Sequence, residues 1–217
     1  MRIFAVIFFV VFCSILASGM WTGWDTSMVS EHGTVERAGL TLFALGAAIT
    51  AARMPASAWP RWWAVPAIFV LFCLRELDMH NAFFDPGLLQ TRIFTSPVPL
   101  WQKVVSAAAM AFILLTVGSL MIRGSGPFTK ALLNKEGWAF AVVLGIGLAI
   151  SAVLIDGADR QLAAIGVTLP SADSIIWIAV EEFLELGFGL ALIFAVCTWE
   201  WPTSSFASHE DRLETSF

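Results

Sequence analysis

The chain has 217 residues, of which 58% are hydrophobic and 13% are charged, and its mean hydropathy is +0.80. A soluble domain carries about 25% charged residues, so this composition excludes a water-soluble fold, and the high hydrophobicity excludes intrinsic disorder. The chain has 12 basic and 17 acidic residues, a net charge of −5 and no basic stripe, which argues against nucleic-acid binding. The remaining class is an all-α polytopic membrane protein.

Six segments contain the roughly 20 apolar residues that a membrane-spanning helix needs. They are Ile3–Met20, Thr34–Met54, Trp62–His80, Val104–Ile122, Gly137–Ile155 and Ser174–Trp199. We interpret all of them as helices, because an open strand cannot satisfy its backbone hydrogen bonds in lipid. The first segment also resembles a signal peptide, and we take it as a true span. The prediction is a bundle of six transmembrane helices, with a single domain at 1–202 and a polar tail at 203–217.

The connections between these segments are short. Gly124-Ser125-Gly126-Pro127 is predicted to be a plain turn after the fourth span. The longer connection Asn81–Leu100 is rich in Phe, Leu and Ile, and is either a short piece lying in the membrane interface or an ordinary loop. Small residues within the spans are expected to allow close helix packing. They are Gly39, Gly46, Gly145, Gly147, Gly187 and Gly189.

Aromatic and basic residues predict the orientation of the chain in the membrane. All ten tryptophans lie near the proposed span boundaries, as an aromatic belt requires. Seven Lys and Arg residues fall on the side of the termini and five on the other side, a weak bias that places both termini in the cytoplasm. For a bacterial protein this location is the inner membrane.

Carboxylates gather on the opposite, outer side, which holds twelve of the seventeen acidic residues. The most deeply embedded are Glu36, Glu76, Asp78, Asp156, Asp159, Glu181, Glu182 and Glu185. Only Arg37, Arg75 and Arg160 accompany them, so about five negative charges lack a partner. An ionised group at the bilayer centre costs roughly 2.5–3.5 kcal/mol. Bound protons, bound cations or a water-filled cavity must therefore compensate this charge.

Helical spacing places several of these groups on shared faces. Glu76 and His80 are one turn apart, and Arg75 and Asp78 are neighbours at i,i+3. The other pairs at helical spacing are Glu182 with Glu185, Glu181 with Glu185, Asp156 with Asp159 and Arg160, and His32 with Glu36. Intramembrane ionisable residues at such spacing are candidates for a functional site.

The hypothesis we favour from the residues is a divalent-metal site that binds Zn, Mn, Fe or Ca. Its predicted ligands are Glu76, His80, Glu182, Glu185, Asp156, Asp159, Glu36 and His32. A metal at this depth would suit hydrolysis or transfer on a lipid or lipid-linked substrate. The predicted catalytic residues are Glu181 and Asp78 as spare carboxylates, and Arg37, Arg75 and Arg160 as anion-binding groups.

Three alternatives stay open. Closely spaced acids can share protons, so the chain is also consistent with a proton- or cation-coupled transporter. The charged face could instead dock a partner protein, which makes the chain an accessory membrane subunit. The third alternative is a purely structural network, in which the three arginines pair with three acids and the other acids reach the headgroups.

Overall fold

The computed structural model describes residues 34–156 and 171–201, and every regular element within these ranges is a helix. The long helices are α3 (Thr34–Arg53), α5 (Ala64–Glu76), α7 (Leu100–Leu133), α8 (Gly137–Asp156) and α10 (Ser171–Thr198). The short ones are η1 (Ala56–Ala58), α4 (Trp59–Trp62), α6 (Met79–Ala82) and η2 (Thr91–Phe94). The predicted all-α class is confirmed for these ranges. The predicted first span Ile3–Met20 and the tail at 203–217 lie outside them.

Three helices are long and apolar enough to cross a membrane: α3 over Val35–Arg53, α7 and α8. A fourth span results if the bent pair Ala56–Trp62 and Ala64–Glu76 is counted as one. α10 has 28 residues and is long enough to span a membrane. It is not among the candidate spans, because the three glutamates within it leave no sufficiently long stretch with two or fewer charged residues. The described residues therefore support a membrane protein, and three helices, or up to four, are candidates for the six predicted spans.

The outward surfaces of α7 and α8 are strongly apolar. Ile122 and Leu114 on α7 are 83% and 73% exposed, and Val153 on α8 is 66% exposed. Contiguous apolar surface of this kind is rare on soluble monomers and is what lipid would cover.

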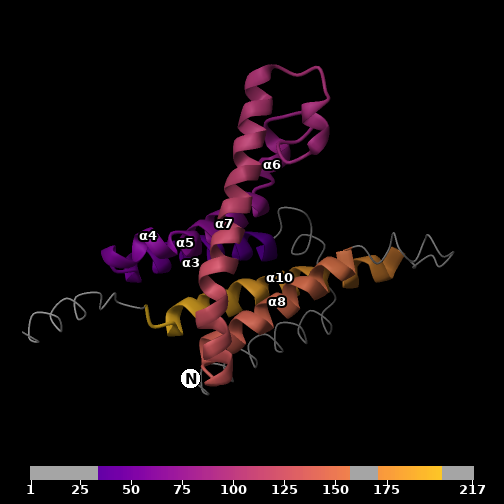
Figure 1. Cartoon of the computed structure of the whole chain (residues 1–217). Helices are drawn as coiled ribbons and strands as arrows, with labels where there is room; N and C mark the ends of the chain where they lie inside the picture. The colour runs from indigo at the N-terminus through magenta and orange to yellow at the C-terminus, as the bar shows by residue number, and fades with distance from the viewer. Residues whose placement is uncertain (1–33, 157–170, 202–217) are drawn as a thin grey trace, which may run out of the picture.

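The helices pack as a layer with one helix laid across it. α10 packs against α8 on one side and α3 on the other, and α3 in turn packs against α5. α7 contacts α5 and crosses the other long helices steeply, and its N-terminal half extends beyond them (Figure 1). The described helices thus form a layer crossed by α7, and they do not show the predicted bundle of six transmembrane helices.

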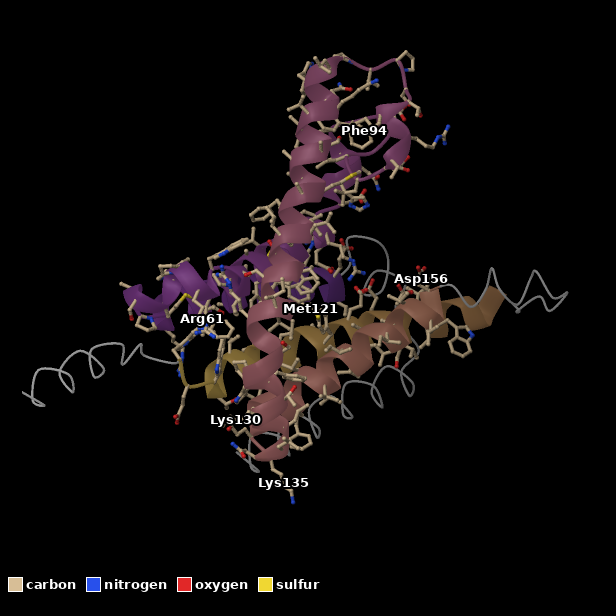
Figure 2. All side chains as sticks on the ribbon, viewed as in Figure 1. Arg61, Phe94, Met121, Lys130, Lys135 and Asp156 are labelled. Atoms are coloured by element: carbon tan, nitrogen blue, oxygen red, sulfur yellow. The ribbon has the colours of Figure 1, made fainter. Side chains whose placement is uncertain are left out.

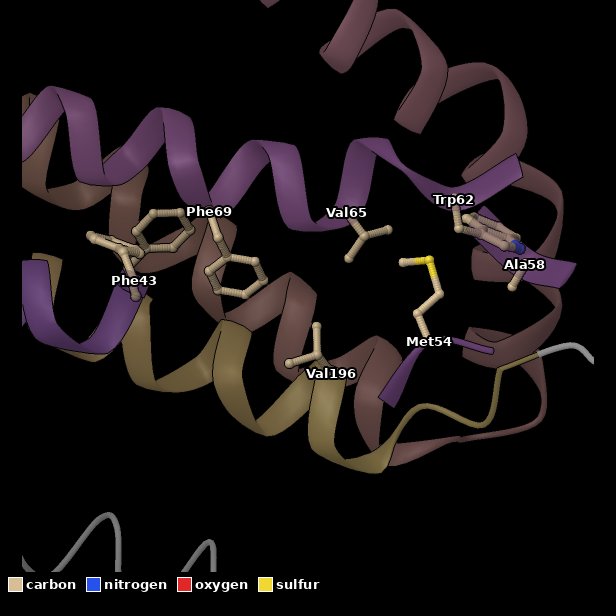
Figure 3. Close-up of a cluster of buried hydrophobic side chains, with 8 residues drawn as sticks. Phe43, Met54, Ala58, Trp62, Val65, Phe69 and Val196 are labelled. Carbon is tan, nitrogen blue, oxygen red and sulfur yellow. The ribbon is translucent and has the colours of Figure 1, made fainter. Parts of the chain in front are cut away.

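The core between α3, α5 and α10 is aromatic (Figure 3). The rings of Phe43, Phe72 and Phe188 contact one another at centroid distances of 5.0–5.8 Å. Glycines let the helices approach, since a Cβ at Gly145 would lie 3.4 Å from Ala191 and one at Gly189 would lie 3.5 Å from Phe43. The predicted packing role is confirmed for these two positions.

Gly46 is the tightest of these contacts and carries a prediction. A Cβ added there would lie 2.3 Å from the ring of Phe69, which is itself only 2% exposed. We expect Gly46→Ala to lower stability by about 1–3 kcal/mol, because the buried ring has no room to shift. The measurement is thermal unfolding of the purified protein in detergent. Gly147→Ala on α8 is the control, because a Cβ there meets nothing within 4 Å. Equal effects of the two changes would contradict the prediction.

The third predicted span, Trp62–His80, is not one straight helix. α4 and α5 meet at Trp63 with a bend of 63°. Pro66 has no N–H to bond the carbonyl of Trp62, so regular hydrogen bonding is interrupted at this point. At the other end α5 stops at Glu76, and Asp78 adopts a left-handed conformation with φ 48° before α6 begins. Aspartate tolerates this conformation better than most residues, and a left-handed residue commonly ends a helix.

The predicted turn at Gly124–Pro127 is wrong, because α7 continues through it to Leu133. Pro127 lacks the N–H that would bond the carbonyl of Arg123, and the Thr129 hydroxyl donates to the Ser125 carbonyl nearby. The helix has 34 residues and is therefore about 51 Å long. This exceeds the roughly 30 Å of a hydrocarbon core, so α7 must tilt or project beyond it.

The connection before α7 folds back on that helix. Ile93 is fully buried, the Phe84 and Trp101 rings meet at 5.4 Å, and Lys103 Nζ donates to the Phe94 carbonyl at 3.0 Å. The segment between α5 and α7 therefore packs against the first turns of α7.

Tryptophans from three elements meet at one end of the layer. Trp199, just after α10, contacts Trp62 of α4 at 4.8 Å, Trp138 of α8 at 5.6 Å and Trp201 at 4.3 Å. We call these four residues the tryptophan cluster. The C-terminal ends of α3 and α10 and the first residues of α8 lie at this end of the layer, so the opposite ends of the same helices lie together at the other end.

Candidate functional site

An ion pair between α5 and α10 forms the centre of the candidate site. Arg75 Nη2 donates to Glu185 Oε1, and the two residues are 110 positions apart in the sequence. The Glu185 side chain is 18% exposed and that of Arg75 is 51% exposed. Arg75 is the last basic residue of α5, and Glu185 lies in the middle of α10, so the pairing depends on how the two helices pack.

Glu76 is the most buried carboxylate for which the structure gives an ion pair. Its side chain is 9% exposed, and Oε1 lies 4.0 Å from Arg75 Nη1. Its other oxygen, Oε2, would lie 3.7 Å from a Cβ on Gly39 of α3. The absence of a side chain at Gly39 thus leaves room for the Glu76 carboxylate between the two helices. The sequence marked Gly39 only as a packing position.

Glu181 and Glu182 complete the group. Glu182 interacts electrostatically with Glu76, Glu181 and Glu185, and Glu181 also interacts with Arg75. We call Glu76, Glu181, Glu182 and Glu185 the acid cluster. Within the described ranges the four carboxylates of this cluster accompany one guanidinium, that of Arg75, which pairs with Glu76 and Glu185 and interacts with Glu181. If all were ionised, their charge would exceed that of Arg75 by three.

Two further predicted residues flank the acid cluster. Glu36, in the first turn of α3, is close enough to interact with Glu76 and Glu182, and Asp156, at the end of α8, interacts with Glu181. Acids of α3, α5, α8 and α10 thus each interact with at least one other acid, and their assignment to one functional site stays a prediction. Arg37 is exposed, and no ion pair joins it to the cluster within the described part of the chain.

His80 and Asp78 form a separate local group. Because α5 ends at Glu76, the predicted one-turn spacing of Glu76 and His80 on a common helix is wrong. His80 Nδ1 instead lies 3.3 Å from Asp78 Oδ1, which also accepts a hydrogen bond of 3.0 Å from Asn81. The predicted pairing of Arg75 with Asp78 is likewise replaced by its pairing with Glu185 and Glu76.

The donor set in the described ranges does not favour a metal. No three His, Cys, Asp or Glu side chains there are placed to hold a metal ion together. Three of the predicted site residues, His32, Asp159 and Arg160, lie outside the ranges that the structure describes. The divalent-metal hypothesis for the whole chain stays a prediction.

Chemically, the acid cluster is suited to binding positive charge. Carboxylates removed from water and placed beside one another disfavour full ionisation, so they hold protons or cations and titrate as a coupled group. The single arginine can pair with only part of this charge.

Comparisons with known protein families, with characterised proteins and with solved structures found no match to this chain.

Proposed function

We propose that this chain is an integral membrane protein that binds and releases protons at the acid cluster, as a proton-coupled transporter does. The observation that supports this most is the charge imbalance within the described ranges. Glu76, Glu181 and Glu185 lie around Arg75, Glu182 adjoins these three carboxylates, and Glu76 and Glu185 are largely buried. In a low-dielectric environment a proton is the smallest cation that can restore neutrality.

The packing of the rest of the layer supports proton exchange at one face of the protein rather than free conduction of protons across it. The aromatic core lies beyond the cluster, with Phe43, Phe69 and Phe188 each at most 7% exposed. The tryptophan cluster follows at the far end. A polar site that ends against a packed apolar core needs a conformational change to reach the other side, as in alternating access.

Basic residues favour an orientation for this protein. Arg53 lies at the C-terminal end of α3, Arg61 in α4, Arg123 and Lys130 in the second half of α7, and Lys135 just after α7. The positive-inside rule then places the tryptophan cluster at the cytoplasmic side and the acid cluster at the outer side. With six spans, both termini are cytoplasmic, and the location in a bacterium is the inner membrane.

Glu182→Gln tests proton binding, because Glu182 interacts with every other member of the acid cluster. Infrared spectroscopy of the reconstituted protein measures the C=O stretch of protonated carboxyl groups across a pH series. We expect wild type to hold at least one such group at neutral pH and to titrate over a broad range. Glu182→Gln should weaken that band and narrow the titration, because the coupling between the sites is reduced.

Glu136→Gln is the matched control, since Glu136 is exposed and accepts a hydrogen bond of 2.7 Å from Trp138 away from the cluster. An equal effect of this control, or no protonated carboxyl in wild type, would overturn the proposal. Transport itself is measured in proteoliposomes carrying an imposed pH gradient and a pH-sensitive dye. Wild type should dissipate the gradient faster than Glu185→Gln. Equal rates of dissipation for wild type and Glu185→Gln would contradict transport through the acid cluster.

The same preparation separates this function from a metal-dependent hydrolase or transferase acting on a lipid or lipid-linked substrate. That alternative predicts a stoichiometric divalent metal, lost on Glu182→Ala and on chelation. A proton site predicts that chelation leaves the unfolding temperature unchanged. An accessory subunit that docks a partner protein predicts co-purification of that partner and neither of the other signals.

A further inference from the structure

A second polar feature lies at the end of the layer opposite to the acid cluster. It is an open pocket of about 560 Å³ between α4 and the second half of α7. Its lining residues are Pro60, Arg61, Ile122, Arg123, Gly126 and Pro127. We call it the arginine pocket. Two of its six lining residues are cationic and none is acidic, so its chemistry is opposite to that of the acid cluster.

The two arginines are held in place by their surroundings. Arg123 Nη1 donates to the carbonyls of Pro60 at 3.0 Å and Arg61 at 2.9 Å, which links α7 to α4. The guanidinium carbon of Arg61 lies 5.5 Å from the ring centroid of Trp62, a cation–π contact. Within the described part of the chain no carboxylate pairs with either arginine. Their positive charge is therefore available to an anion.

The surface of α7 on either side of the pocket carries groups that a ligand in it could also contact. Arg123, Gly126, Pro127 and Lys130 follow one another at i, i+3, i+4 and i+7, which is one face of a helix. Figure 2 shows Arg61 and Lys130 on the same side of the lower half of α7. In the other direction Ile122 and Leu115, seven residues apart, are 83% and 64% exposed. Cationic groups thus adjoin an exposed apolar stripe.

We propose that the arginine pocket binds the phosphate of an anionic phospholipid, with an acyl chain along Leu115 and Ile122. Guanidinium groups are well matched to phosphate oxygens. A free phosphate would need only the arginines, whereas a lipid also uses the apolar stripe beside them. The tryptophan cluster, which includes Trp62, is the kind of aromatic group found at headgroup level. Basic pockets beside membrane helices on the cytoplasmic side are known to bind such headgroups.

The test uses the purified full chain in detergent, titrated with phosphatidylglycerol or phosphatidylcholine and followed by native mass spectrometry. We expect wild type to retain phosphatidylglycerol in preference to phosphatidylcholine. Arg61→Gln should weaken phosphatidylglycerol binding roughly fivefold, the effect of one basic residue near an anionic headgroup. Arg61→Lys keeps the charge and should recover most of the binding. Lys135→Gln removes a basic residue outside the pocket and should have no effect.

A second pair of variants tests the pocket without changing charge. A Cβ at Gly126 or at Gly124 meets nothing within 4 Å, so both positions accept a larger side chain. Gly126→Leu fills the pocket and should reduce phosphatidylglycerol retention, whereas Gly124→Leu, on another face of α7, should not. Equal retention of the two lipids, or wild-type binding by both Arg61→Gln and Gly126→Leu, would overturn the proposal. Binding of inorganic phosphate without phosphatidylglycerol would overturn the lipid as the source of the phosphate.

Discussion

Arg75→Gln is expected to destabilise the protein by about 1–3 kcal/mol at neutral pH. This range lies between the values for exposed and buried ion pairs, because Arg75 is 51% exposed and Glu185 is 18% exposed. The substitution leaves Glu76, Glu181 and Glu185 without the guanidinium with which they interact. The measurement is thermal unfolding in detergent. In acid the carboxylates take up protons and their repulsion is lost, so the difference from wild type should shrink as the pH falls.

Further variants separate charge from packing at this position. Arg75→Lys keeps the positive charge and should retain more stability than Arg75→Gln. The double variant Arg75→Gln with Glu185→Gln removes both partners and should recover part of the loss, a coupling that a double-mutant cycle measures. Arg92→Gln, in the exposed turn before α7, is the control. If Arg92→Gln is as destabilising as Arg75→Gln, the ion pair does not hold α5 against α10.

Trp199→Ala is expected to have the larger effect on stability, about 3–5 kcal/mol. Its ring contacts three other tryptophan rings at 4.3–5.6 Å, which join α4, α8 and the segment after α10. Aromatic pairs contribute about 0.5–1.5 kcal/mol each beyond their buried area, so the loss of three pairs adds to the cavity that the substitution leaves. Thermal unfolding monitored by circular dichroism measures this change in stability.

Trp101→Ala provides the matched comparison for the tryptophan cluster. Trp101 is 58% exposed and contacts one ring, that of Phe84 at 5.4 Å. Its loss should destabilise the protein by a fraction of the effect at Trp199. Equal destabilisation by the two substitutions would show that the tryptophan cluster does not join these elements.

Helix positions followed from the sequence where a long apolar run ended at polar residues. The predicted Thr34–Met54 and Gly137–Ile155 agree with α3 and α8 to within one residue at each end, and Ser174–Trp199 agrees with α10 to within three. The reason is that hydropathy reports the length of an apolar segment directly. The tendency of the acids to gather at one end also followed, because alternating spans return the chain to the same side.

Backbone geometry inside the apolar segments did not follow from hydropathy. The bend at Trp63 and the left-handed Asp78 interrupt a segment that is apolar throughout most of its length, and α7 runs through a Gly-Ser-Gly-Pro sequence typical of a turn. Glycine and proline destabilise a helix interior by about 1 and about 3 kcal/mol relative to alanine. Tertiary contacts of similar energy offset this cost and keep the segment helical. The hydrogen bonds from Arg123 to α4 are contacts of that kind.

The sequence by itself determined that this is an apolar, helical chain whose acidic residues outnumber its basic ones. The tertiary structure alone decided which acids share the arginine. Neighbours in the sequence favoured Asp78 as the partner of Arg75, whereas the packing of α5 and α10 brings Glu185 to it from 110 residues away. Electrostatic interaction depends on distance in space and on exclusion of water. Both are set by helix packing, and residue spacing along a single helix does not report them.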